Sequence, residues 1–336
     1  MPTNFKLEPF NPSLLWRHPH AQTILANSLR PTSGVTFYRL RLDTPDGDFL
    51  DLDFASVAGV PLPGSAPLVL LLHGLEGSAR SNYAHETYRQ LAARGIRAVG
   101  MNFRSCSGEM NRTGRLYHAG KTDDVDLVVN WLLEHRPGVP LGMVGFSLGA
   151  NLLIKYLGEK GVHTAVRAAV AVSPPFDLGR IADTFEQGEG RLYALRFIRD
   201  LQKKALLLSQ RNGIAIDMQR ILNVKSMREF DEAFTAPLHG YRDADEYYAL
   251  NSCGRFVPSI RVPTLVIRAL DDPMFAHDIP HAALAGNDQI TPALTPHGGH
   301  VAFAEGNFPR RFHYWAERQA ARYLATYLLE PNGRIR

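Results

Sequence analysis

The order of apolar and polar positions follows two different spacings along most of the chain. Short apolar runs occur at residues 68–72, 96–101, 141–146, 165–172, 264–269 and 289–294. Between several of these runs, apolar residues recur three and four positions apart, as at residues 83–94, 123–135 and 148–157. Short continuous runs are typical of strands covered on both faces, and the wider spacing is typical of amphipathic helices. The alternation predicts an α/β protein with a mostly parallel central sheet flanked by helices.

Two other stretches depart from this alternation. Residues 35–42 and 49–54 alternate apolar and polar side chains around the turn sequence Pro-Asp-Gly-Asp, which predicts a hairpin. Residues 176–258 carry helical patterns and no strand candidate, which predicts a helical cap inserted over the edge of the sheet. Helices that only pack beside the sheet are the alternative. We expect a core of residues 1–175 and 259–336, a cap of residues 176–258, and a last helix at 310–329.

Composition narrows the class of protein further. The chain has 336 residues, of which 45% are hydrophobic and 21% charged, so it can bury a large core without disulfides or structural metal. The net charge is +4 with no basic run, which argues against a nucleic-acid partner. The first residues lack the apolar core of a signal peptide, and no apolar run has the roughly 18 residues of a membrane span. We therefore expect a cytoplasmic protein without a transmembrane segment; the sequence leaves its oligomeric state open.

A sequence of the G-x-S-x-G type lies between a predicted strand and a predicted helix, at Gly145-Phe146-Ser147-Leu148-Gly149. In a nucleophile elbow, such a strand-to-helix turn holds the serine in strained backbone geometry and presents its hydroxyl above the sheet. The flanking glycines let the strand and the helix approach closely. The motif therefore predicts Ser147 as a nucleophile, against the alternative of an ordinary turn with a capping serine.

A serine hydroxyl needs a base, and the base needs an acid to orient it. In the order Ser, acid, His, the chain offers Asp272 after the strand at 264–269 and His300 after the strand at 289–294. Both follow the carboxyl ends of strands, the edge at which Ser147 is expected. Asp271 is the alternative acid, and His300 is preferred to His297 because two glycines precede it. A zinc or iron site built from these two aspartates and two histidines is the competing interpretation.

Two backbone N–H groups are needed to stabilise the oxyanion of an acyl-transfer intermediate. One is expected from Leu148, which follows the nucleophile. The other is expected from Leu75, in the glycine-containing loop His73-Gly74-Leu75-Glu76-Gly77-Ser78 after the strand at 68–72. The loop is not a P-loop, because no Gly-Lys-Ser/Thr follows it. The predicted chemistry requires no cofactor and no metal.

Two further patterns have competing interpretations. His118 and Asp123 fit H-x-x-x-x-D, a pattern of some acyltransferases, but Thr122 or Asp123 at this loop-to-helix junction also suits a helix cap. The predicted cap supplies apolar residues either to an acyl pocket or to packing between helices. These are Phe176, Phe185, Leu192, Tyr193, Leu195, Phe197 and Ile198.

With these residues in place, the sequence resembles the α/β-hydrolase superfamily, and more narrowly the YheT-like esterases, which are related to ABHD-type lipases and plant EMB8-like hydrolases. The resemblance rests on segments spread over nearly the whole chain. They are residues 20–23, 73–78, 102–109, 117–120, 145–151, 228–231, 239–241, 271–273 and 298–300. It implies that Ser147, Asp272 and His300 form a catalytic triad. The chain departs from the pattern at Ser105, where glycine is usual, and it lacks the N-terminal membrane anchor of the animal relatives.

These observations predict a serine hydrolase that cleaves carboxylic esters with short- to medium-chain acyl groups through an acyl-enzyme. The expected partner is a small-molecule ester. An acyltransferase, a lipase on acylglycerol-type substrates, an amidase and a non-catalytic ligand-binding protein are the alternatives.

Overall fold

The computed structural model describes residues 5–212, 217–275, 278–306 and 312–329. Its main sheet has the strand order β1-β2-β4-β3-β5-β6-β7-β8, and β9 pairs separately with β10. The strands are β1 (Val35–Asp43), β2 (Phe49–Val57), β3 (Leu68–Leu72), β4 (Arg97–Asn102), β5 (Leu141–Phe146), β6 (Val166–Val172), β7 (Thr264–Ala269), β8 (Ile290–Thr295), β9 (Ala304–Glu305) and β10 (His313–Tyr314). The strands from β4 to β8 run parallel, whereas β2 is antiparallel to both β1 and β4. The predicted hairpin and the mostly parallel sheet are confirmed.

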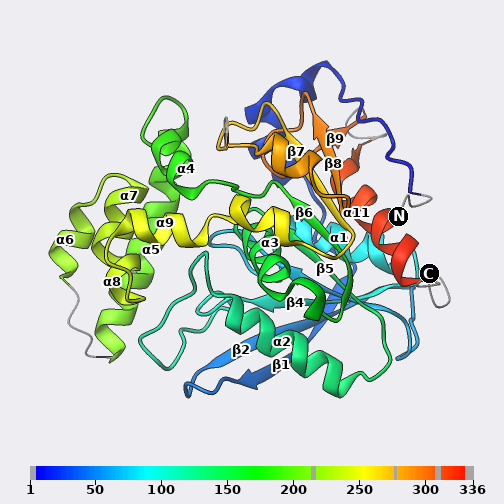
Figure 1. The fold of residues 1–336 in the computed structure, drawn as a ribbon, viewed down its shortest axis with the longest axis horizontal. Coiled ribbons are helices and arrows are strands. Elements are labelled where there is room, and N and C mark those ends of the chain that lie inside the picture. Colours follow the sequence, from blue (N-terminus) through cyan, green and yellow to red (C-terminus); the bar gives the residue numbers. More distant parts are fainter. Residues whose placement is uncertain (1–4, 213–216, 276–277, 307–311, 330–336) are drawn as a thin grey trace.

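Helices cover both faces of this sheet (Figure 1). The described α-helices are α1 (Asn82–Ala92), α2 (Thr122–His135), α3 (Leu148–Lys160), α4 (Leu178–Phe185), α5 (Gly190–Asn212), α6 (Met218–Asn223), α7 (Met227–Phe230), α8 (Ala236–Leu238), α9 (Ala244–Asn251), α10 (His281–Ala285) and α11 (Trp315–Leu328). Helices α2 and α3 pack on one face, and α1 and α11 on the other. The first three predicted helices are therefore confirmed within a few residues.

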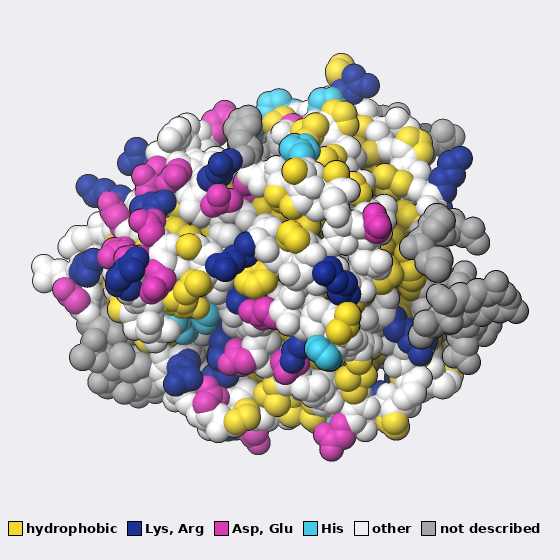
Figure 2. Space-filling model, viewed as in Figure 1, with side chains coloured by type: hydrophobic (Ala, Val, Ile, Leu, Met, Phe, Trp, Pro, Cys, Tyr) yellow, Lys and Arg dark blue, Asp and Glu magenta, His cyan; other side chains and the backbone are white. Residues whose placement is uncertain are grey.

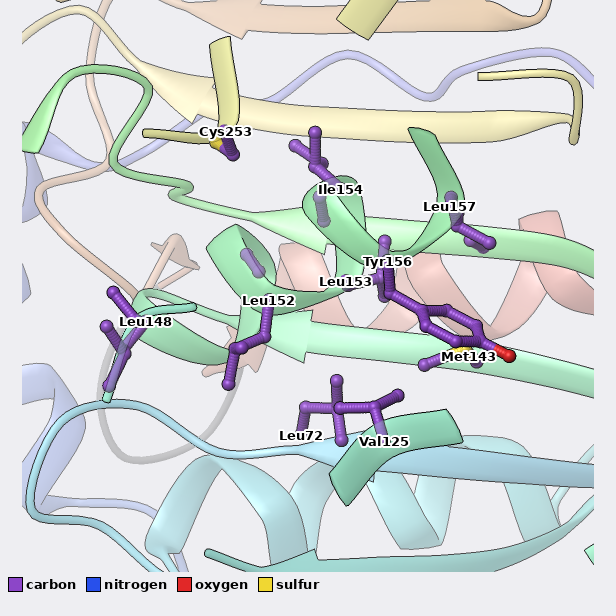
Figure 3. Packing of buried hydrophobic residues seen from close by; sticks show 14 of the residues in the cluster. Leu72, Val125, Met143, Leu148, Leu152, Leu153, Ile154, Tyr156, Leu157 and Cys253 are labelled. Carbon is purple, nitrogen blue, oxygen red and sulfur yellow. The ribbon is translucent and has the colours of Figure 1, made fainter. Parts of the chain in front are cut away.

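Alternating side chains of the central strands fill the two halves of the core. On β3, Leu68, Leu70 and Leu72 point towards α2 and α3, whereas Val69 and Leu71 point towards α1 and α11. Figure 3 shows Leu72 and Met143 facing Val125 of α2 and the leucines of α3. Every residue of β3 is buried, because both faces are covered, and this explains why the run is apolar throughout.

The prediction for the last helix is wrong at its start. Residues 310 and 311 lie outside the described residues, and His313–Tyr314 form β10, so helix α11 begins only at Trp315. Pairing between Tyr314 and Ala304 keeps this segment extended. The Trp315 N–H then donates to the carbonyl of Phe303 at 2.9 Å, which brings the helix start against the end of the site loop.

The described part of residues 176–258 contains helices and no strand, as predicted. Helices α4 to α8 gather at the left of Figure 1, beside the sheet and its flanking helices. They share an apolar cluster of their own, in which Phe185, Ile198 and Phe230 are buried together with Met274 and Phe275 of the core. The helical insertion is therefore the cap of an α/β-hydrolase fold; the proposed boundaries at residues 176 and 258 remain a prediction.

Charges of both signs are interspersed on the face drawn in Figure 2, which agrees with the small net charge of +4. Within the described ranges, no helix has the length and apolar character needed to cross a membrane.

Candidate active site

Ser147 lies in a strained turn between β5 and α3. Its backbone has φ 52° and ψ −120°, and the helix begins at the next residue, Leu148. A non-glycine residue with positive φ costs about 1–3 kcal/mol and persists only where the surrounding structure enforces it. Here the Ser147 N–H donates to the carbonyl of Val172 on β6 at 2.9 Å. The turn therefore places the Ser147 hydroxyl within hydrogen-bond distance of His300.

The two glycines of the motif are required by close packing around this turn. A Cβ on Gly145 would lie 2.4 Å from the carbonyl oxygen of Gly149, and a Cβ on Gly149 would lie 2.3 Å from that of Leu72. Both obstructing atoms belong to the backbone, so neither can rotate aside. The glycines thus let α3 cross directly over the ends of β3 and β5, as the motif predicts.

Three of the predicted site residues meet at the carboxyl edge of the sheet. His300 Nε2 lies 2.9 Å from Ser147 Oγ, and His300 Nδ1 lies 2.8 Å from Asp272 Oδ2. An ionised carboxylate can only accept, so the imidazole proton is on Nδ1 and Nε2 is left to accept from the Ser147 hydroxyl. Asp272 and His300 are buried, with exposed fractions of 3% and 5%. The arrangement is a continuous hydrogen-bonded chain from a carboxylate to a serine hydroxyl.

Asp272 is held as an anion by four donors. Burial alone would raise the pKa of Asp272, but its interactions with His300 and with the Arg268 guanidinium, and the hydrogen bond from the Met274 N–H, bring it below its usual value. Arg268 donates to Asp272 at 2.9 Å, and the N–H groups of Met274 and Phe275 donate at 2.9 and 3.2 Å. These hydrogen bonds keep the Asp272 carboxylate ionised and also fix the orientation of its two oxygens.

The alternative residues form a second, separate pair. Asp271 lies 3.3 Å from His297 Nδ1 and accepts from the Gly299 N–H at 3.0 Å, so it braces the loop that carries His300. The structure therefore brings Asp272, and not Asp271, within reach of His300. Among the described residues, no group of three or more His, Cys, Asp or Glu side chains is arranged to hold a metal ion.

Two backbone N–H groups near Ser147 are left without acceptors. In the loop after β3, the N–H groups of Gly74, Glu76, Gly77 and Ser78 all donate within the protein. Neither Leu75 in that loop nor Leu148 at the start of α3 has a hydrogen-bond acceptor for its N–H among the described residues. Leu75 and Leu148 both line the cavity that Ser147 lines. The two predicted oxyanion donors are thus unpaired and next to the serine.

The N-terminal segment at residues 20–23 holds the His300 loop from outside. Thr23 Oγ1 accepts from the His300 N–H at 3.0 Å, and the Gln22 amide both donates to and accepts from the backbone of Ala304. A Cβ on Gly299, which has φ 60°, would meet Gln22 and Thr23 at 2.7 Å. In the sequence, residues 20–23 stood out only as part of the family resemblance. Their contacts show that they hold the backbone of His300 and Ala304 in place.

A cavity of about 110 Å³ opens from Ser147 between the core and the cap. Its walls are mostly apolar and include Ile181, Phe185, Phe197 and Leu201 of the cap. Of the seven cap residues considered above, Phe185 and Phe197 line the cavity, Leu192 is exposed, and Phe176 and Ile198 pack in apolar clusters. Both alternatives are therefore realised, and Phe185 and Phe197 line the cavity while also packing in the cap's apolar cluster.

The H-x-x-x-x-D pattern does not form a second site. His118 Nδ1 accepts from the Gly120 N–H at 3.1 Å, whereas Asp123 pairs with Lys121 at 2.5 Å. The capping alternative is also wrong, because α2 begins at Thr122 without a side-chain cap and the Thr122 hydroxyl donates to Glu159. His118 instead lines the cavity, and burial keeps its pKa well below the usual value.

Sequence reasoning missed Arg268 and Asp278. Arg268 is fully buried on β7 and donates both to Asp272 and, at 2.6 Å, to Asp278. Burial raises the pKa of Asp278 to about 6, although Arg268 opposes this. An arginine within an otherwise apolar strand was the available signal, since a buried guanidinium requires carboxylate partners.

Comparison with known proteins agrees with this geometry. Residues 67–307 match the model of the alpha/beta hydrolase fold family. The chain belongs to that family. It is 37% identical to "Putative esterase YheT" of Escherichia coli (strain K12), over 92% of this chain and 91% of that one. It is 30% identical to Phospholipase ABHD3 of Mus musculus, over 91% of this chain and 76% of that one. The structure of the Pyrococcus furiosus esterase Pf2001 shares the fold, with a TM-score of 0.55 and 18% identity over 87% of this chain and 93% of that one.

Asp231, at the cavity wall, gives this α/β hydrolase a testable pH dependence. Burial raises the pKa of Asp231 to about 6, against the lowering effects of Thr235, Tyr248 and Arg228. The folded state therefore holds the proton more tightly than the unfolded state, and this carboxyl reduces stability as the pH rises from about 4 to about 6. Asp231→Asn removes the titration, so the melting temperature of the native protein relative to the variant should fall across that range. Parallel melting-temperature profiles would contradict this assignment.

Proposed function

We propose that this protein is a serine esterase that hydrolyses carboxylic esters through an acyl-enzyme, with Ser147 as nucleophile, His300 as general base and Asp272 as the orienting acid. The observation that carries the proposal is the unbroken hydrogen-bond chain from Asp272 through His300 to Ser147, next to two unpaired backbone N–H groups.

The first half of the reaction forms the acyl-enzyme. Ser147 Oγ attacks the ester carbonyl carbon while His300 Nε2 takes the hydroxyl proton, and the carbonyl π electrons move onto oxygen. The Leu75 and Leu148 N–H groups donate to that oxyanion, and the positive end of the α3 dipole adds to their effect. The intermediate then collapses, the ester C–O bond breaks, and His300 returns its proton to the leaving alcohol.

The second half repeats these steps with water. His300 takes a proton from water, the hydroxide attacks the acyl carbon, and Ser147 leaves with the proton. Asp272 keeps Nδ1 protonated throughout, so that Nε2 always faces the reacting atoms. The four hydrogen bonds to Asp272 support this role, because they leave the carboxylate no freedom to turn away.

The cavity supports a substrate with an apolar acyl group. The cap residues Phe185, Phe197 and Leu201 line the same cavity as Ser147, and such apolar walls suit an acyl chain better than a polar group. The likeness to a protein named as a phospholipase makes lipid esters the second substrate class. p-Nitrophenyl esters of graded chain length, compared with a medium-chain phospholipid, distinguish the two classes.

Ser147→Ala should abolish ester hydrolysis without unfolding the protein. Loss of the nucleophile in such a triad typically lowers kcat by about 10⁶-fold, and the smaller side chain leaves the turn and its glycines in place. Steady-state kinetics on p-nitrophenyl butyrate, with circular dichroism as the folding control, provide the measurement. Retention of most of the activity would rule out Ser147 as the nucleophile.

Asp272→Asn and Asp271→Asn form a matched pair of neighbouring substitutions. Asp272→Asn should lower kcat by about 10⁴-fold, because an amide no longer fixes the Nδ1–H tautomer of His300. Asp271→Asn should lower it by less than about 10-fold, since Asp271 braces the loop but does not touch His300. A larger effect from Asp271→Asn than from Asp272→Asn would reverse the assignment of the acid.

A further inference from the structure

A buried charged cluster outside the proposed triad joins the cap to the loop that carries Leu75. Lys204 of α5 lies 2.8 Å from Glu76 Oε1 and 3.0 Å from Cys106 Sγ, and its ammonium lies 5.1 Å from the centre of the Tyr117 ring. The three partners come from three separate core segments, residues 73–78, 102–109 and 117–120. These are segments on which the family resemblance rests, and the proposed reaction uses only the first.

Glu76 is the next residue after the proposed oxyanion donor, and its backbone is strained. It has φ 53°, in the left-handed region that non-glycine residues rarely adopt. Tyr117 holds it at two points, since its hydroxyl accepts from the Glu76 N–H at 3.0 Å and donates to Glu76 Oε1 at 2.6 Å. Lys204 donates to the same carboxylate oxygen and adds the only contact in this set that comes from the cap.

The other side of Leu75 is held entirely by the core. The Gly74 N–H donates to the Tyr83 hydroxyl at 2.8 Å, and the Gly74 carbonyl accepts from the Gly77 N–H at 3.0 Å and lies 2.7 Å from His73 Nδ1. The direction of the Leu75 N–H is therefore set by its two neighbours, Gly74 and Glu76. Of these two neighbours, Glu76 is the one with a hydrogen bond to a cap residue, while the Leu75 side chain itself packs against the apolar cluster of the cap.

The charges in this cluster are well defined. The side chains of Lys204 and Glu76 are exposed by only 14% and 10%. Burial alone would lower the pKa of Lys204, but its contacts with Cys106 and Glu76 oppose this, so the ammonium stays protonated. Burial raises the pKa of the Cys106 thiol to about 11, so the thiol is neutral near pH 7. Glu76 is therefore the counter-charge of Lys204.

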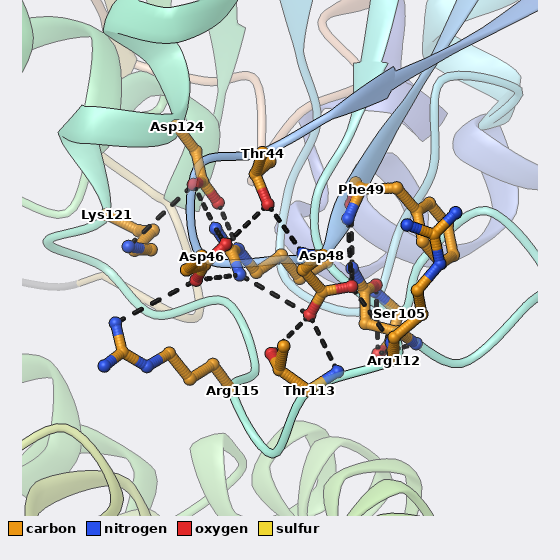
Figure 4. A network of polar contacts seen from close by, with 12 residues as sticks. Thr44, Asp46, Asp48, Phe49, Ser105, Arg112, Thr113, Arg115, Lys121 and Asp124 are labelled. Atoms are coloured by element: carbon orange, nitrogen blue, oxygen red, sulfur yellow. Dashed lines mark hydrogen bonds and ion pairs between the residues drawn. The ribbon is translucent and has the colours of Figure 1, made fainter.

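The loop that carries Cys106 is itself rigid. Arg104 donates to Asp124 and Asp46, and Asp48 accepts from the N–H groups of Arg112 and Thr113 (Figure 4). Ser105, which stands where glycine is usual, adopts φ 60° and exchanges hydrogen bonds with Asn111. Lys204 thus contacts a core surface that is held by its own hydrogen bonds. Its contacts with Glu76 and Cys106 form only when α5 packs on that surface.

We propose that Lys204 is a positioning residue that reaches from the cap to hold Glu76, and through it the Leu75 N–H, in the geometry needed to receive the oxyanion. The inference rests on the proposed esterase function and adds a coupling to it: the oxyanion site is complete only while α5 lies on the core.

Lys204→Met tests this coupling, with Lys203→Met as the matched control on the same helix. Lys203 is exposed by 75%, and its ion-pair partner among the described residues is Asp200. Lys204→Met should lower kcat by about 10- to 100-fold, less than outright loss of an oxyanion donor, and leave KM within about 3-fold. Lys203→Met should match the native enzyme. Endpoint labelling with a fluorophosphonate counts reactive sites, so that kcat is expressed per active site.

Two more variants separate positioning from stability. Lys204→Arg keeps the charge and should recover most of kcat. The double variant Glu76→Gln with Lys204→Met leaves no unpaired buried carboxylate, so it should regain melting temperature but not kcat. The proposal is overturned if the Lys204→Met variant has a kcat per labelled site within about 2-fold of that of the Lys203→Met control, whatever its melting temperature. Absence of turnover and labelling in the native protein would instead contradict the esterase function, and the inference with it.

Discussion

The left-handed turn at Ser147 is the constraint on which the rest of the site depends. A serine at φ 52° is strained by about 1–3 kcal/mol, and the turn persists because β5 and α3 are anchored in the apolar core on either side of it. Gly145 and Gly149 lack the Cβ atoms that would collide with the backbone where the helix crosses the strand ends. Once the turn is fixed, the Leu148 N–H and the Ser147 hydroxyl are adjacent without any further adjustment.

The remaining groups are brought to this turn by buried polar contacts rather than by apolar packing. Arg268 pairs with both Asp272 and Asp278, so groups that would each be costly to bury alone are buried as one network. His300 is held at both of its backbone groups, with Thr23 accepting from its N–H and the Ser173 hydroxyl donating to its carbonyl. Thr23 near the N-terminus and Ser173 in the middle of the chain thereby fix the backbone of His300.

The strands and the nucleophile turn were predictable because each leaves a local pattern. The apolar run at β3 and the glycines around Ser147 follow from burial and close approach, which act on neighbouring residues. Asp272 was predicted as the acid with Asp271 as the alternative, because adjacent residues differ in where their side chains point and no local pattern records that direction. Arg268, Asp278 and Lys204 were missed because the local sequence around each residue does not show which side chains it contacts in the folded protein. The late start of α11 depends on pairing with Ala304, which no local pattern records.

A crystal structure of the protein after reaction with an alkyl p-nitrophenyl phosphonate tests the central claim most directly. The account predicts phosphorus bonded to Ser147 Oγ and the alkyl group in the cavity under Phe185 and Phe197. It also predicts a phosphoryl oxygen about 2.7–3.1 Å from the nitrogens of both Leu75 and Leu148. An unmodified Ser147, or a phosphoryl oxygen directed away from those two N–H groups, would contradict it.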